Sequence, residues 1–421
     1  MENIENKIPN GENQDTQNSS FFSENVSSSN GLEAKAPLLR FRKFTHPWRQ
    51  EKLSDFTSRI MRKNSNNETE LPLTISSKDG LVDQVTFFNK KVSSKDMSGY
   101  YLLKNGEFAY NKSYSNGYDF GSIKRLERYE MGALSTLYIC FSLKKHCSDY
   151  IKHYFDSLKW YRQIYIISAE GARNHGLLNV PTDDFFATIH FLSPDIEEQK
   201  KIADFLSLID QRIEKQRQLV ENLKKYKRGL LSAIFDRKLR FKDTDFSLWK
   251  NVRLSECCLG FDNKRQPISS ELREKGTVPY YGANGIQDYV KDYIFDGEYI
   301  LLAEDGGHFD EFQTKPIAQY ITGKSWVNNH AHILQATEKD CTKYIYYALV
   351  HKDIRKYING SSRAKLNQED MWQIVILLPN LKQQIKIAQF MSSIDKILSI
   401  EEKMLTVLEE KKQGLLQQMF I

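Results

Sequence analysis

The chain has 421 residues, of which 40% are hydrophobic and 12% aromatic, so it is long enough to fold around more than one core. The 60 Lys and Arg residues against 54 Asp and Glu leave a formal net charge of +6, which permits a polyanionic partner without requiring one. No membrane-spanning apolar run and no signal peptide occur, which predicts a cytosolic protein without a membrane partner. Five cysteines without a Cys-x-x-Cys pair argue against a disulfide framework or a zinc ribbon.

Residues 1–37 are predicted to form a loose tail. They hold seven Asn and six Ser, few apolar residues and no period, so they cannot bury enough surface to offset the entropy of ordering. Folding is predicted to begin near Leu38. A first globular domain is then expected over residues 38–193.

A long helix is predicted to follow, within residues 194–236. Asp195 and Glu198 have the spacing of a capping box, and the preceding Pro194 helps to end the incoming strand. Apolar residues then recur at alternating steps of four and three, which is the spacing of a coiled coil. A helix over Ile196–Phe235 would be a rod of roughly 60 Å.

The same helix is predicted a second time, within residues 379–421, after a second globular domain over residues 237–378. At an offset of 185 residues, 15 of 42 positions are identical, and both apolar seams carry polar residues at matching points. The predicted seam consists of Ile202, Leu206, Ile209, Ile213, Val220, Leu223 and Leu230 in the first helix, and of Ile387, Met391, Ile394, Leu398, Leu405, Leu408 and Leu415 in the second.

The two helices are predicted to form an antiparallel pair. A stripe of this width buries its apolar side chains only against another helix, and each helix is the obvious partner of the other. The first helix ends 13 residues before the next strand-like stretch, and 13 extended residues reach only about 43 Å, less than the rod that a parallel pair would have to span.

The globular domains are predicted to be copies of one unit. Four pairs of segments match in the same order, namely residues 40–55 with 240–256, 78–83 with 283–288, 105–110 with 296–301, and 171–179 with 360–367. Between these anchors the copies differ widely in length and composition. The predicted fold is therefore mixed α/β (α+β), with two tandem domains, internal duplication and an antiparallel two-helix coiled coil.

This doubled pattern, a strand ending in Leu-x-Pro followed by "LKQQIKIAQFMSSID" and a heptad helix ending in "GLLQQMF", resembles the specificity subunit of type I restriction-modification systems. The resemblance covers residues 38–421. It implies two target recognition domains that each read one half of a bipartite site in double-stranded DNA, and a coiled coil that sets the spacer. It also implies a bacterial or archaeal subunit without catalytic activity or a cofactor of its own. The expected partners are two methyltransferase subunits, which bind S-adenosylmethionine, and restriction-translocase subunits, which use ATP and Mg²⁺.

The residues themselves give no support to an enzyme. No glycine-rich cofactor loop with an amine-holding [Asn/Asp]-Pro-Pro-aromatic segment occurs, and no phosphate-binding Gly-x-x-x-x-Gly-Lys-[Ser/Thr]. "PDIEEQK" (194–200) resembles a nuclease motif, but its carboxylates are compressed into a helix start.

No metal site is predicted. Cys140, His146, Cys147 and His153 fall in a window that is expected to be helical, where buried thiols and surface histidines are favoured over zinc. His330 and His332 are expected to alternate on one strand, facing the same side, where a framework or DNA-facing role is favoured.

Candidate DNA contacts come from loops at matching positions of the two copies, because Arg, Asn and Gln make paired hydrogen bonds to base edges and Lys and Arg neutralise phosphates. The leading candidates are Arg173, Asn174 and His175 in the first copy and Ser361, Ser362, Arg363 and Lys365 in the second. Ser77 and Lys78, with Tyr280, Tyr281 and Asn284, come next, and Lys112, Lys124 and Arg125 are weaker phosphate candidates.

Two alternatives stay open. Each of these loops could be an ordinary solvated turn. The whole chain could be a coiled-coil scaffold or adaptor that does not bind DNA, for which the modest net charge is the best support.

Overall fold

The computed structural model describes residues 22–24, 36–90, 92–168, 178–239, 241, 246–360 and 364–421. The chain forms two compact units, unit 1 from Met1–Lys215 with Thr406–Ile421 and unit 2 from Gln216–Leu405. Part of each long helix therefore belongs to each unit. No helix in the described ranges is long and apolar enough to cross a membrane.

The amino-terminal region contains a short strand that the composition did not indicate. Strand β1 (Phe22–Glu24) pairs antiparallel with β2 (Leu39–Phe41), so the prediction of a loose tail is wrong at this point. The other residues up to 35 lie outside the described part of the chain.

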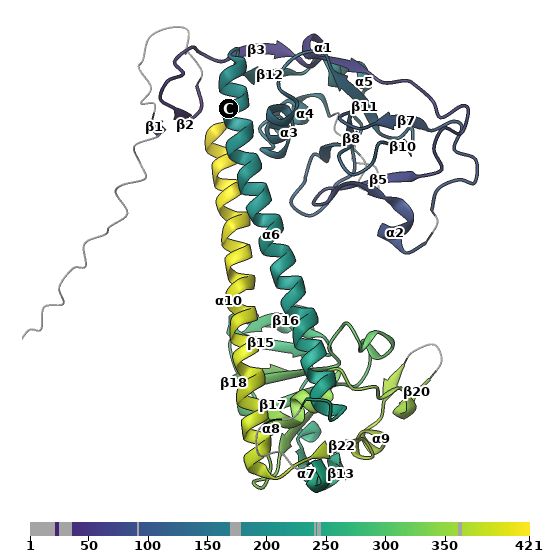
Figure 1. The fold of residues 1–421 in the computed structure, drawn as a ribbon, viewed down its shortest axis with the longest axis vertical. Helices are drawn as coiled ribbons and strands as arrows, with labels where there is room; N and C mark the ends of the chain where they lie inside the picture. Colours follow the sequence, from purple (N-terminus) through teal and green to yellow (C-terminus); the bar gives the residue numbers. More distant parts are fainter. Residues whose placement is uncertain are drawn as a thin grey trace, which may run out of the picture. The chain divides into compact units, whose positions relative to one another are not determined.

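The described part of unit 1 contains two four-stranded sheets and two two-stranded ones, of which β1-β2 is the first (Figure 1). The four-stranded sheets run in the orders β6-β5-β10-β7 and β4-β11-β8-β9, and β3 pairs with β12. The strands are β3 (Arg49–Lys52), β4 (Thr57–Arg59), β5 (Pro72–Ser76), β6 (Gly80–Asp83), β7 (Tyr101–Lys104), β8 (Phe108–Asn111), β9 (Ser122–Arg125), β10 (Met131–Leu134), β11 (Ile139–Leu143) and β12 (Ile189–Leu192), and the short helices are α1 (Leu53–Phe56), α2 (Gln84–Phe88), α3 (Ser148–Asp156), α4 (Tyr161–Ile167) and α5 (Thr182–Ala187).

Unit 2 is built on a six-stranded sheet, with the order β14-β19-β17-β18-β15-β16, and β13 pairs with β22 as β3 does with β12. The strands are β13 (Lys250–Arg253), β14 (Cys258–Gly260), β15 (Lys275–Gly282), β16 (Gly285–Val290), β17 (Phe295–Ala303), β18 (Ala318–Val327), β19 (Ala331–Ala336), β20 (Ile358–Asn359), β21 (Lys365–Leu366) and β22 (Val375–Leu378). The helices are α7 (Leu254–Cys257), α8 (Thr342–Leu349) and α9 (Gln368–Trp372), with 3₁₀ turns at Phe246–Leu248, Asp262–Lys264, Ser270–Leu272, Phe309–Glu311 and Arg355–Tyr357.

The predicted duplication is confirmed by matched elements in matched order. Trp48 and Trp249 are both buried just before the strands β3 and β13. Leu53 opens α1 with its N–H 2.9 Å from the Thr188 carbonyl oxygen, and Leu254 opens α7 with the same bond, also 2.9 Å, to Ile374. The turns predicted from Asp-Gly and Asn-Gly join the hairpins β5-β6 and β15-β16.

The two long helices are α6 (Ile196–Phe235, 40 residues) and α10 (Leu381–Met419, 39 residues), which lie side by side (Figure 1). Every predicted seam residue is buried or half-buried, whereas most other positions along both helices are exposed. In unit 2 the direction is antiparallel, because Gln216 of α6 meets Glu401 of α10, and Lys227, further along α6, meets Asp395, nearer the start of α10. The predicted antiparallel coiled coil is confirmed.

The ends of the long helices complete the core of each unit. Leu416, Met419 and Phe420, at the end of α10, are buried with α3 and the aromatic residues of unit 1. Leu231 and Ile234, at the end of α6, are buried with α8 in unit 2. In each unit, the end of one long helix is therefore part of the core itself rather than attached to the core by a loop.

Candidate nucleic-acid interface

In unit 2, loops that the sequence placed at two candidate positions come together around one open hollow of about 650 Å³. The hollow is lined by Ala283, Asn284, Gly285, Ile286, Gln287, Asp305, Gly306, Gly307, His330 and Ala364. Asn284 is fixed at its edge, because the amide nitrogen donates to the Gly306 carbonyl oxygen at 2.8 Å. Ala364 follows directly on Ser361, Ser362 and Arg363, which lie outside the described residues.

The polar groups around this hollow are paired. Gln287 accepts a hydrogen bond from the Asn328 amide at 3.1 Å, and the His330 ring lies 2.5 Å from Asp305. Lys365, a predicted DNA contact, lies 3.1 Å from a carboxylate oxygen of Glu304 and is 49% exposed. Lys365 can still reach solvent, but its charge is shared with Glu304.

The two tyrosines predicted beside Asn284 are mainly core residues. Tyr280 is only 1% exposed, its hydroxyl lies 3.2 Å from the backbone nitrogen of Ile268, and the Arg273 guanidinium stacks on its ring at 4.2 Å. A buried ring cannot touch a duplex, so the prediction for Tyr280 is wrong. Tyr281 is half-buried, and burial raises the pKa of its hydroxyl.

In unit 1 the corresponding segments also converge. The Ser77 hydroxyl, in the turn between β5 and β6, lies 2.8 Å from that of Ser115 and 3.1 Å from that of Ser122. The carbonyl oxygen of Lys112 accepts from the backbone nitrogen of Leu178 at 3.0 Å, and Lys78 is exposed in the same turn as Ser77. Leu178 directly follows residues 169–177, which lie outside the described part of the chain and include Arg173, Asn174 and His175.

The two weaker phosphate candidates of strand β9 are held in internal ion pairs. Lys124 lies 2.6 Å from Asp156, and Arg125 lies 2.6 Å from both Glu127 and Asp149. Burial opposes the charge of Lys124, but the Asp156 carboxylate beside it raises the lysine pKa above its ordinary value. A phosphate would have to displace these carboxylates, so the arrangement favours a structural role for both side chains.

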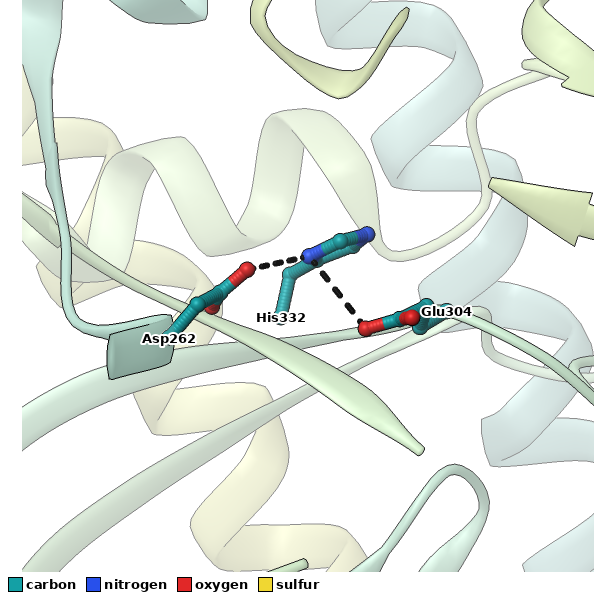
Figure 2. A group of neighbouring side chains, drawn as sticks. All are labelled: Asp262, Glu304 and His332. Carbon is teal, nitrogen blue, oxygen red and sulfur yellow. Dashed lines mark hydrogen bonds and ion pairs between the residues drawn. The ribbon is translucent and has the colours of Figure 1, made fainter. Parts of the chain in front are cut away.

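Among the described residues, three side chains of unit 2 are close enough together to hold a metal ion, Asp262, Glu304 and His332 (Figure 2). The His332 Nδ1 atom lies 2.6 Å from Asp262 and 3.7 Å from Glu304, and its Nε2 atom lies 2.9 Å from the Leu366 carbonyl oxygen. Both ring nitrogens have hydrogen-bond partners within the protein, so a metal ion could bind His332 only by displacing one of them.

The charges around this cluster are already balanced. Arg265 lies 2.5 Å from Glu304 and 3.5 Å from Asp262, and Lys365 supplies a further positive charge to Glu304. Burial alone would raise the pKa of Asp262, but the contact with His332, the backbone N–H of Ile333 and the charge of Arg265 together hold that pKa below its ordinary value. The cluster is therefore an internal ion-pair network that joins β19, β21 and the turn at Asp262.

Two expectations about histidines are wrong in their local structure. Residues 140–153 are not one helix, because Cys140 lies on β11, His146 has a φ of 75°, and α3 begins only after Cys147. His330 lies in the turn between β18 and β19, and only His332 lies on a strand.

Glu198 has a structural role that its sequence position did not predict. This residue has no exposed surface, and its carboxylate accepts from Arg40 at 2.6 and 2.9 Å, from the Trp48 indole at 3.2 Å and from the Ser193 hydroxyl at 2.5 Å. The predicted capping box is therefore wrong for Glu198, and Asp195 alone caps the helix, accepting from the Glu197 nitrogen at 2.9 Å.

A matched pair of buried glutamines ties each long helix to its unit. Gln199 accepts from the backbone nitrogen of Cys147 at 2.8 Å, and Gln384 accepts from that of Cys341 at 2.8 Å. Cys147 and Cys341 are the residues that precede α3 and α8. Both repeats have a glutamine at this position, 185 residues apart, and this match could have indicated a shared structural role.

Comparison with known proteins finds relatives for part of the chain. Residues 247–410 match the family described as the type I restriction modification DNA specificity domain. A putative type I restriction enzyme specificity subunit of Haemophilus influenzae is 37% identical over 151 residues, 36% of this chain and 38% of that protein. A putative type I specificity subunit of Mycoplasma pneumoniae is 26% identical over 217 residues, 50% of this chain and 83% of that one.

Solved structures agree on the fold. The S subunit of a type I restriction-modification system from M. genitalium has a TM-score of 0.56 at 16% identity, over 92% of this chain and 99% of that one. The match spans less than two fifths of the length of the Haemophilus relative. The chain is therefore a duplicated α/β protein. It has two long helices, and candidate loops come together on each of its two units. Residues 247–410 are similar to type I restriction modification DNA specificity domains, and the fold is that of the solved S subunit.

Proposed function

We propose that the chain is the sequence-specific DNA-recognition subunit of a type I restriction-modification complex, acting in the cytoplasm of a bacterium or archaeon. Each unit reads one half of a bipartite site in double-stranded DNA, and the α6-α10 pair sets the length of the DNA between the halves. The observation that carries this proposal is the convergence of matched loops in two units that share a scaffold, together with the DNA specificity domain over residues 247–410.

Two units with the same arrangement of strands and helices but different loops fit the recognition of two different DNA sequences. The matched elements fix the loops in place, while the residues that would touch bases differ between the copies. In unit 2, Asn284 and Gln287 at the hollow are side-chain types that pair with adenine in the major groove. Because the described residues that line the hollow include no Lys or Arg, phosphate contacts would come from other positions.

The partners follow from the same proposal. The outer face of α10 carries Ile397, Ile400 and Met404 at helical spacing, with 46%, 61% and 43% of their surface exposed. An apolar stripe of this kind on a helix fits an amphipathic helix of another subunit. We assign it to a methyltransferase subunit, with two such subunits per chain, and S-adenosylmethionine, ATP and Mg²⁺ belong to the partner subunits rather than to this chain.

Salt dependence separates DNA recognition from a protein scaffold. The assembly purified with its methyltransferase subunit should bind a defined duplex with an affinity that falls steeply as salt rises, because phosphate contacts release counterions. Binding that is equal for all duplexes, or absent, would favour a scaffold.

Two substitutions test the assignment of one half-site to each unit. Arg173→Ala and Arg363→Ala lie at matched positions of the two copies. Each should relax selectivity in one half-site only, by about 1–3 kcal/mol at one base pair. Mapping of methylated bases in cells that carry each variant would show this, with Lys200→Glu, an exposed position of α6, as the control.

A further inference from the structure

The two long helices make the same charged contact twice, once in each unit. In unit 1, Asp210 of α6 lies 2.6 Å from Lys412 of α10. In unit 2, Asp395 of α10 lies 2.5 Å from Lys227 of α6. The repeat offset of 185 residues relates the two aspartates to each other and the two lysines to each other, so the helices exchange roles between the contacts.

Each aspartate also faces the globular part of its unit. The His153 ring of α3 has its Nδ1 atom 3.9 Å from Asp210 and its Nε2 atom 3.2 Å from the Ser207 hydroxyl. The Tyr347 hydroxyl of α8 donates to Asp395 at 2.5 Å and lies 3.5 Å from the Ser392 hydroxyl. We call these groups the aspartate joints; they consist of Asp210, Lys412, Ser207 and His153 in unit 1, and of Asp395, Lys227, Ser392 and Tyr347 in unit 2.

The joints are shielded from solvent. Both lysine side chains are 15% exposed, and Asp210 and Asp395 are 28% and 32% exposed. Charges in such positions are costly to leave unpaired, because water reaches them only in part. A conformation that separates an aspartate from its lysine would therefore be disfavoured more strongly than one that breaks an exposed ion pair.

A shift of one helix along the other by a heptad would separate each aspartate from its lysine. In an antiparallel pair, such a shift would place Asp210 opposite Leu405 or Met419 instead of Lys412. The seam itself would still align apolar residues with apolar residues, because it repeats every seven positions.

The second joint would be lost by the same shift, with Asp395 opposite Val220 or Ile234. Midway between the joints, Gln216 donates to Glu401 at 2.6 Å, and the shift would place it opposite Ile394 or Leu408. Every shifted register therefore buries polar groups against apolar side chains at three points.

We propose that the aspartate joints select the register of α6 against α10 and thereby the length of the DNA spacer. The second half of this statement rests on the proposed function; the first does not. The apolar helix ends also pack into the cores of the units, but apolar packing adapts to substitution, whereas a carboxylate without a partner does not.

Cross-linking reads the register without DNA. In the full chain, Gln216→Cys with Glu401→Cys should form a disulfide, identified by peptide mass mapping. Adding Lys227→Glu and Lys412→Glu should lower this yield and produce a disulfide when the second cysteine is placed at Ile394 or Leu408. Exchanging the charges, with Asp210→Lys plus Lys412→Asp and Asp395→Lys plus Lys227→Asp, should restore the first disulfide.

Selection from a random duplex library then reads the spacer. The wild-type assembly should enrich one bipartite site with one spacer length. The Lys227→Glu, Lys412→Glu variant should enrich the same half-sites while its preference for that spacer falls by about tenfold. Lys200→Glu, which reverses an exposed charge of α6 outside the seam, should change nothing.

The outcomes separate the two proposals. If the wild type enriches no bipartite site, the proposed function fails and the cross-links still test the register. If the charge-reversed variant keeps both the disulfide between positions 216 and 401 and the wild-type spacer, the joints do not select the register. If that variant loses its helical circular dichroism, Lys227→Met with Lys412→Met replaces it, and a native register in this neutral variant overturns the proposal equally.

Discussion

At the scale of single residues, buried histidines make unit 1 sensitive to acid. The His190 ring lies between the Tyr154 hydroxyl and the Thr188 hydroxyl, each at 2.8 Å. Thr188 donates its own proton to the Phe185 carbonyl oxygen at 2.7 Å, so it accepts from His190 Nε2, and Nδ1 accepts from Tyr154. Burial lowers the pKa of His190 to about 3.

A folded-state pKa this far below the ordinary histidine value makes stability fall as pH falls. The unfolded chain takes up a proton below about pH 6.5, while the folded ring does not until about pH 3, so stability is lost across that window. Hydrogen exchange of unit 1 should therefore accelerate from pH 7.5 to 5.5 beyond its intrinsic pH dependence. His190→Gln should reduce this effect, and the exposed His46→Gln should not; equal pH dependence in all three proteins would contradict the assignment.

A second residue-scale prediction concerns the carboxylate of Glu198. It is the partner of Arg40, which is only 4% exposed, and Glu198→Ala would leave that guanidinium buried without a counter-charge. The expected loss is about 3–5 kcal/mol in the free energy of unfolding of unit 1. Urea unfolding followed by hydrogen exchange of unit 1 peptides measures it. Glu197→Ala, next to it but exposed, is the matched control and should cost little.

At the scale of elements, the buried glutamines should respond unequally to the same substitution. In unit 2, the Gln384 amide nitrogen donates to the Pro379 carbonyl oxygen at 2.9 Å and to Asp340 at 2.8 Å. Gln384→Glu would turn this donor into an acceptor that faces two acceptors. The expected result is a loss of helical order around α8, detected as faster hydrogen exchange of its amides.

The matched Gln199→Glu should be milder. The Gln199 amide nitrogen faces the Ser193 carbonyl oxygen at 2.7 Å and His146 Nδ1 at 2.8 Å. Imidazole can take up a proton and donate to the new carboxylate, whereas the Pro379 carbonyl oxygen beside Gln384 can only accept. An equal loss in both units would show that the glutamines act only through the Cys147 and Cys341 nitrogens.

The helices and their contacts also show which features of the fold could be predicted from the sequence. The seam, the helix bounds and the antiparallel direction followed from the heptad spacing and the connection lengths, because local periodicity and chain reach determine them. The local spacing of Asp195 and Glu198 predicted a helix cap. The true partner of Glu198, Arg40, could not be predicted, because it lies 158 residues away and no periodicity links the two. Tyr280 was read as a surface residue for the same reason, since its burial depends on Arg273 and the loop at Ile268.

At the scale of the whole molecule, the proposed spacer function predicts the effect of lengthening both helices. One heptad inserted into each helix at the Gln216–Glu401 contact keeps both aspartate joints, because one lies on each side of it. Seven residues at 1.5 Å each add about 10 Å, which corresponds to about 3 base pairs of duplex at 3.4 Å per pair.

The added DNA does not match the helices in rotation. A heptad completes two turns of a coiled-coil helix, whereas about 3 base pairs turn the duplex by about 100° at 10–10.5 pairs per turn. The lengthened protein should therefore prefer a spacer longer by about 3 pairs with unchanged half-sites, at lower affinity, because DNA must untwist or bend to present both halves. Methylome sequencing measures both halves and the spacer. Insertion into α6 alone should abolish recognition, since the seam and joints then misalign, and a spacer that stays constant after the double insertion would refute the helix pair as its determinant.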